Sequence, residues 1–100
     1  MRMITLSSYS QKDNIIFRKI HGSYFLIDIT DNYANDKCSL FEVNEIGSFL
    51  WNEMSSNFTV EEITHKLQNA IIDEIDYETL FQDVNEFTFS LLCKGFIEVT

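Results

Sequence analysis

The segment Val43–Trp51 restricts the fold more than any other part of this chain, because it joins a strand to a helix without a loop. Asn44 follows the apolar end of the predicted strand, and Asn is among the residues preferred as a helix N-cap. After it, apolar residues recur at helical spacing, namely Ile46, Phe49, Leu50 and Met54. Trp51 stands beside this stripe and is expected to pack at its edge. The pattern predicts a strand that runs directly into a short helix.

Two further helices are predicted downstream. Thr59 and Glu62 have the spacing of a capping box, in which a hydroxyl and a carboxylate each accept a bond from a main-chain N–H group. Behind them, one apolar face is formed by Ile63, Leu67 and Ile71. The third helix is predicted to run from about Asp76, a suitable N-cap, to Lys94, with Gly95 ending it. Its inner stripe is expected to be Leu80, Val84, Phe87 and Leu91.

Short strands precede these helices. Ile15–Ile20 and Tyr24–Ile29 are rich in β-branched and aromatic residues, which favour strands. The His21–Ser23 turn between them contains a glycine and predicts a hairpin. A third strand is expected at Lys37–Val43, and its alternation directs two side chains to the core, Phe41 and Val43.

Strands followed by three small helices form the layout of a winged helix-turn-helix domain. A single domain is expected, because 100 residues bury one hydrophobic core. The predicted fold class is α+β, with a three-stranded antiparallel sheet followed by three helices over residues 15–100. Residues 1–14 are expected to form a loose arm or a short edge strand, and Phe96–Val99 a closing strand or an extended tail.

Acidic residues outnumber basic ones by 16 to 7, which gives a net charge of −9. A duplex-binding protein neutralises phosphates with Lys and Arg, so nucleic acid is a disfavoured partner. A basic or neutral peptide, or a positively charged protein surface, is a better electrostatic match. No stretch has the pattern of a membrane span or a signal peptide. We therefore expect a cytoplasmic protein with no membrane partner, in which Cys38 and Cys93 are reduced packing residues.

No residue pattern predicts catalysis or metal binding. His21 on a turn and His65 on a helix do not make a metal site, and both are expected at the surface. The acidic residues Asp73, Glu74 and Asp76 lack the alternating ligand spacing of a calcium loop. No nucleophile motif or Gly-rich phosphate loop is present. We expect a protein that is not an enzyme, with no catalytic residues, no metal and no cofactor.

A binding surface is the remaining expectation. The outer edge of the third strand, Lys37–Glu42, is predicted to be unpaired and to offer N–H and C=O groups to another chain. A second row on the third helix, about a third of a turn from the inner stripe, is expected to form the opposite wall: Phe81, Asn85, Thr88 and Leu92. Acidic side chains are expected to rim this groove: Glu42, Glu78 and Asp83. Alternatively, the second row packs under the N-terminal arm or in a homodimer.

Four segments follow one another in a recognisable order and spacing: Tyr24–Asp28, Val43–Trp51, Thr59–Ile63, and a last group of Asp83, Val84, Phe87, Leu91 and Gly95–Ile97. Together they resemble the PqqD-like family, also called ribosomal-peptide recognition elements. The resemblance covers about Phe17–Val99. It departs from the family at Ser55–Asn57, where many relatives have a Gly-containing turn.

This resemblance implies a winged helix-turn-helix fold and a role in binding the leader segment of a ribosomally made precursor peptide. It implies that the leader lies as an extra strand beside the third strand and against the third helix. Leu40 and Phe81 are expected on the peptide side. Carried onto this chain, the peptide-binding residues are Lys37, Cys38, Ser39, Leu40, Phe41, Glu42, Tyr77, Phe81, Val84, Asn85, Thr88 and Leu92.

The expected function is that of a non-catalytic adaptor that delivers the precursor leader to a separate maturation enzyme. The implied enzyme classes are a radical SAM enzyme and the leader peptidase of a lasso-peptide pathway. One alternative is a winged-helix transcription regulator that binds DNA or a protein partner. It needs a basic recognition helix, whereas the third helix has only Lys94 at its end. Another alternative, a small enzyme or metal protein, needs a tight polar constellation that the sequence does not contain.

Overall fold

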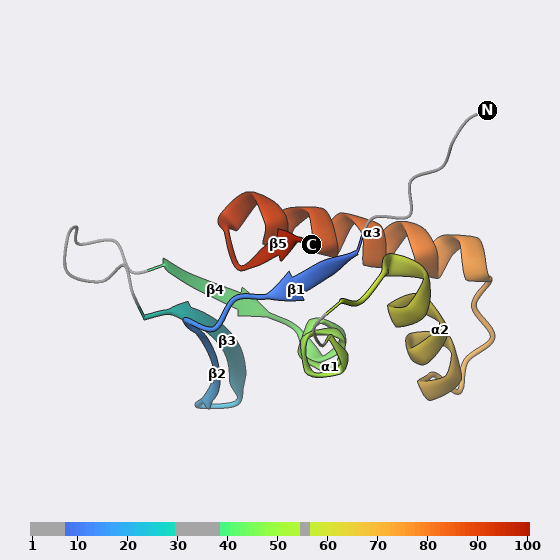
Figure 1. Cartoon of the computed structure of the whole chain (residues 1–100). Coiled ribbons are helices and arrows are strands. Elements are labelled where there is room, and N and C mark those ends of the chain that lie inside the picture. The colour runs from blue at the N-terminus through green and yellow to red at the C-terminus, as the bar shows by residue number, and fades with distance from the viewer. Residues whose placement is uncertain (1–7, 30–38, 55–56) are drawn as a thin grey trace.

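A computed structural model describes residues 8–29, 39–54 and 57–100 of the chain. It is an α+β fold with a three-stranded antiparallel sheet and three helices, as predicted (Figure 1). In chain order the elements are β1 (Tyr9–Gln11), β2 (Ile15–Ile20), β3 (Ser23–Asp28), β4 (Ser39–Val43), α1 (Glu45–Glu53), α2 (Val60–Ala70), α3 (Tyr77–Lys94) and β5 (Ile97–Val99). None of the described helices is both long and apolar enough to cross a lipid bilayer.

The sheet has the strand order β2-β3-β4, with every neighbouring pair antiparallel. The predicted hairpin is present, but its turn is one residue shorter than expected, because Ser23 already pairs with Ile20. The two turn residues, His21 and Gly22, both have positive φ, at 51° and 83°. A two-residue loop with positive φ at both positions matches the right-handed twist of the flanking strands.

Strand β4 runs directly into α1, as the Val43–Trp51 segment predicts. The Asn44 Oδ1 atom accepts a 2.8 Å hydrogen bond from the Gly47 N–H group and caps the helix. The expected apolar stripe is wrong at its first position, because Ile46 is 49% exposed. Trp51, expected at the edge, is buried. The buried face of α1 contains Gly47, Leu50, Trp51 and Met54, so it is rotated about the helix axis relative to the predicted stripe. The prediction missed its first position because glycine has no side chain that a hydrophobic pattern could detect.

The other two helices begin where their capping residues predict, and α3 also ends as predicted. Thr59 and Glu62 form the capping box, with both bonds at 3.1 Å, and Asp76 caps α3 with a longer bond of 3.4 Å to the Thr79 N–H group. Gly95 ends α3 with φ of 80°. The inner stripe of α3 is confirmed as core, with Leu80, Val84 and Leu91 buried and Phe87 packed against them.

Cys93 is a free cysteine, and its side chain is exposed. The expectation that it packs in the interior is therefore wrong. Its position on α3 explains this, because it lies about 160° around the helix from the buried Leu91. Cys38 lies outside the described residues.

The chain's two ends form a second small sheet in which β1 pairs with β5. Tyr9 also exchanges two main-chain hydrogen bonds with Phe58, at 2.8 and 2.9 Å, on the other side of β1. The Gln11 side-chain amide donates to the Trp51 carbonyl at 2.8 Å. Of the two expectations for the N-terminal segment, a short edge strand therefore describes residues 9–11, and this β1–β5 ribbon lies along α3 (Figure 1).

Candidate functional site

The outer edge of β4 carries no paired strand among the described residues. One side of β4 pairs with β3 through five residues, from Ser39 to Val43. The N-terminal strand β1 pairs with β5 and Phe58 instead of β4. Unpaired main-chain groups on such an edge provide a template for another chain. Two residues predicted to extend the edge, Lys37 and Cys38, lie outside the described residues, and β4 begins at Ser39.

Alternate residues of β4 face opposite sides of the sheet. Phe41 pairs with Leu26, which is fully buried, so Phe41 and Val43 face the helices as predicted. Leu40 pairs with Ile27 and Glu42 pairs with Phe25, so both face the other side. The alternation along β4 thus places Leu40 on the face opposite Phe41 and Val43, so a role for Leu40 in peptide binding stays a prediction. Its side chain is 51% exposed on the opposite face of the sheet.

The wall of α3 that approaches β4 is formed by Phe87 and Lys94. The Phe41 and Phe87 rings are stacked with their centroids 6.5 Å apart. The Lys94 Nζ atom lies 4.9 Å from the centroid of the Phe41 ring, within range of a cation–π interaction. Phe87 and Lys94 are seven residues apart, so they share one face of the helix two turns apart. The edge of β4 and this face of α3 define the β4–α3 groove.

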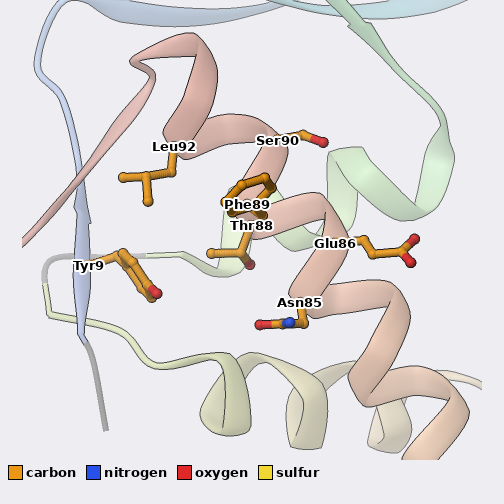
Figure 2. Close-up of a pocket in the computed structure, with 7 residues that line it drawn as sticks. All are labelled: Tyr9, Asn85, Glu86, Thr88, Phe89, Ser90 and Leu92. Carbon is orange, nitrogen blue, oxygen red and sulfur yellow. The ribbon is translucent and has the colours of Figure 1, made fainter. Parts of the chain in front are cut away.

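The second row of α3 does not face β4, which corrects the predicted wall. Asn85, Thr88 and Leu92 line a hollow of about 430 Å³ together with Tyr9 of β1 (Figure 2). Phe81 lies about a third of a turn around α3 from Phe87. Asn85, Thr88 and Leu92 therefore lie on the side of α3 where β1 runs, and Asn85 is exposed there.

The remaining predicted residues of α3 are also placed away from the β4 edge. Tyr77 contacts the His65 ring of α2 at 5.0 Å between centroids, and the Phe81 ring at 6.0 Å. Val84 is fully buried in the core. Thr88 is buried too, and its hydroxyl donates to the Val84 carbonyl at 2.8 Å. Side chains that are already buried in the chain's own packing offer little surface to a ligand.

An apolar hollow of about 310 Å³ lies where β4 passes into α1. It adjoins the groove at Phe87, which lines this hollow and contacts Phe41 of β4. Two of its apolar side chains are substantially open to solvent, Ile46 at 49% and Ile75 at 38%. Asp83 supplies the only charged side chain among the residues that line it. The rest of the lining is Asn44, Gly47, Leu50, Leu67, Ile71, Thr79, Leu80 and Val84.

The chemistry of the site suits binding. Among the described residues no group of three or more His, Cys, Asp or Glu side chains could hold a metal ion. Burial raises the pKa of Tyr77 above its ordinary value, and the nearby Glu61 carboxylate adds to the rise. This tyrosine lies at the α2 side of α3, outside the β4–α3 groove.

Comparison with known proteins identifies the family. The family described as coenzyme PQQ synthesis protein D (PqqD) matches residues 33–97, about two thirds of the chain. The chain belongs to the PqqD family. Its fold is similar to the solved structure of TbiB1 in complex with the TbiA(beta) leader peptide, with a TM-score of 0.68 and 19% sequence identity. That match covers 89% of this chain and 94% of TbiB1. No curated protein matches the sequence.

In this PqqD-family chain, the sequence did not predict three parts of the site. These are the lining residues on α1, those at the end of α2, and the face of α3 that carries Phe87. Phe87 was predicted as core only, and Lys94 as a helix-terminal residue. Ile46 was predicted only as part of the apolar stripe of the first helix, whereas it is exposed and lines the hollow. One available signal was Ile75, an apolar residue among the acidic residues of the connection between α2 and α3.

Proposed function

We propose that this chain is a non-catalytic adaptor that binds the leader segment of a precursor peptide as an additional strand on β4. The observation that carries this proposal is the outer edge of β4, unpaired among the described residues and flanked by Phe87 and Lys94 of α3. Strand addition at a sheet edge derives affinity from main-chain hydrogen bonds and specificity from pockets for alternate side chains. The structural similarity to TbiB1, solved with a leader peptide, supports the same reading.

The groove also limits which peptides would fit. Alternate side chains of an added strand would point toward α3, over the surface of Phe87. Where the strand passes Val43, an inward side chain would reach the apolar hollow of about 310 Å³. A bulky apolar residue of the leader would remove water from Ile46 and Ile75 there. Asp83 at the hollow and the chain's net charge of −9 favour Lys or Arg nearby in the leader.

Delivery is the second part of the proposed function. A leader held on β4 keeps the rest of the precursor tethered, which raises its effective concentration at an enzyme bound to the adaptor. We propose a separate maturation enzyme as the second partner, either a radical SAM enzyme or a leader peptidase. Co-purification of the tagged adaptor with each enzyme encoded beside its gene would distinguish the two classes.

Two matched substitutions test the groove. Ile46→Glu places a carboxylate at the mouth of the apolar hollow, whereas Ile72→Glu places one at a position that is 95% exposed and outside the hollow. Both change isoleucine to glutamate at solvent-accessible sites, so both proteins are expected to fold. Ile46→Glu should weaken binding of a fluorescent leader peptide roughly tenfold or more, because burying an unpaired carboxylate costs over about 1.4 kcal/mol.

The control variant Ile72→Glu should bind the same peptide like the unsubstituted protein. The probes are synthetic peptides that span the first part of each short precursor encoded beside the gene. Fluorescence anisotropy gives the affinity, and amide chemical shifts locate the site. Equal affinity of both variants, or shifts confined to the β1 side of α3, would contradict binding in the β4–α3 groove.

A further inference from the structure

The face of the three-stranded sheet that points away from the helices carries four apolar side chains and two charged ones. Its side chains belong to the residues that alternate with the core-facing ones, and cross-strand pairing places Ile16, Ile27 and Leu40 side by side in one row. The neighbouring row is Arg18, Phe25 and Glu42. These six residues are called here the outer sheet face. The β2–β3 hairpin that carries four of them projects away from the helices (Figure 1).

This face is not part of the core. Ile16, Phe25 and Ile27 are half-buried, yet none of them belongs to the described partly buried residues that pack against the core cluster. Leu40 is 51% exposed. Side chains of this size on one side of a sheet expose a contiguous apolar surface, and such a surface on a soluble domain marks an interaction site. The β4–α3 groove does not use it, because Phe41 and Val43 face the other way.

The charges on this face select its partner. Arg18 lies at one margin on β2 and Glu42 at the other margin on β4, in the same cross-strand row on either side of Phe25. A two-fold axis along β3 would stack two such faces with β2 of one copy over β4 of the other. Each Arg18 would then oppose a Glu42, and Ile16 would oppose Leu40. A two-fold axis across the strands would instead place β2 over β2, without this charge pairing.

We propose that the outer sheet face joins two copies of this chain in a face-to-face dimer about a two-fold axis along β3. Aligned stacking of two sheets about 10 Å apart is a common packing mode, and a two-fold interface requires a self-complementary surface of this kind. The leader-binding edge of β4 stays open in this arrangement. The dimer is therefore independent of the proposed function, and either can fail without the other.

The size of the face predicts a reversible dimer. Three strands about 4.8 Å apart and about 20 Å long present roughly 300 Å² in plan, well below the roughly 800 Å² per partner of a stable interface. The net charge of −9 on each copy opposes association, and this repulsion is screened at about 0.15 M salt. The dimer should therefore form progressively as the protein concentration rises.

Sedimentation equilibrium of the full chain without peptide tests the proposal. From about 10 μM to about 1 mM, the average mass should rise from 11.7 kDa toward twice that value. Phe25→Asp should abolish the rise, whereas Ile72→Asp, at a fully exposed position off the face, should not. Circular dichroism checks that each variant is folded.

A charge exchange tests the orientation of the two copies. Arg18→Glu or Glu42→Arg alone should each raise the dissociation constant roughly threefold or more, because each places like charges together twice. The double variant should restore the original value. A mass that stays at 11.7 kDa would overturn the dimer and leave the face for another protein. A dimer unaffected by Phe25→Asp, or a double variant that fails to recover, would overturn this interface and its orientation respectively.

Discussion

At the scale of single residues, Gly47 sets how closely α1 approaches its neighbours. A Cβ atom at this position would lie 3.0 Å from Val43 Cβ, 3.2 Å from Phe87 Cε1 and 3.3 Å from the Asn44 Oδ1 atom that caps the helix. The absent side chain therefore lets Phe87 close over the start of α1, between the core and the apolar hollow. A residue with no side chain carries no hydrophobic signal, which explains why pattern reading assigned the stripe to Ile46.

Gly47→Ala tests this close approach. Alanine is favoured over glycine inside a helix by about 1 kcal/mol, so helix propensity alone predicts stabilisation. Crowding against the Val43 Cβ atom, which cannot move without its backbone, should reverse the sign and lower the free energy of unfolding by about 1–3 kcal/mol. Urea denaturation measures the difference, with the exposed Glu45→Ala in the same helix as control. A stabilised Gly47→Ala protein would show that α1 moves away freely.

At the scale of elements, the three helices differ in how firmly their first turns are held. Helix α2 begins with a complete capping box, in which both the Thr59 hydroxyl and the Glu62 carboxylate accept at 3.1 Å. Helix α3 begins at Asp76, whose Oδ2 atom accepts from the Thr79 N–H group at 3.4 Å and from the Thr79 hydroxyl at 3.0 Å. The start of α2 directly follows Phe58, whose main chain bonds Tyr9 of β1. Capping of α2 therefore supports the attachment of the N-terminal strand.

Thr59→Ala should lower the free energy of unfolding by about 1 kcal/mol, because it leaves the Glu62 N–H group without its hydroxyl partner. Asp76→Ala should cost less, since the main-chain bond that it removes is longer, and the exposed Thr79 hydroxyl that it also releases can bond water instead. Chemical denaturation of the two variants side by side makes this comparison. A larger loss for Asp76→Ala would contradict this ranking, which rests on the main-chain capping bonds.

At the scale of the whole molecule, the winged helix-turn-helix layout is combined with charges that oppose DNA. Helix α3 carries three carboxylates, Glu78, Asp83 and Glu86, and one cation, Lys94. That ammonium group lies over the Phe41 ring in the β4–α3 groove. A duplex-binding helix needs several Lys and Arg side chains directed at phosphates, and α3 offers none apart from Lys94. Within the described part of the chain, the same layout leaves the outer edge of β4 unpaired beside this helix.

We expect no complex with a random DNA duplex in an electrophoretic mobility shift assay, even at low salt where electrostatic attraction is strongest. At low salt, the net charge of −9 repels the phosphate backbone, because few ions screen the repulsion. A salt-sensitive complex in that assay would contradict this expectation and favour the transcription regulator that the fold alone suggests.

Much of the fold follows from local signals in the sequence. Asn44, the Thr59–Glu62 pair and Gly95 place the ends of the helices because each satisfies main-chain groups within a few residues of itself. Alternation in β4 correctly assigns Phe41 and Val43 to the core, because the period of a strand is fixed by its backbone. The edge predicted for peptide binding is likewise present from Ser39 onward.

The face of α3 that meets this edge was decided only by the tertiary structure. Both apolar rows of α3 satisfy the helical period, so the pattern cannot tell which one faces β4. The choice depends on β1, which pairs with β5 across 86 to 90 positions of the chain and occupies the side of Asn85, Thr88 and Leu92. Pairing between such distant segments leaves no periodic trace near α3. The sequence by itself determined the elements and the exposed edge, and packing of the two chain ends determined which helical wall stands beside it.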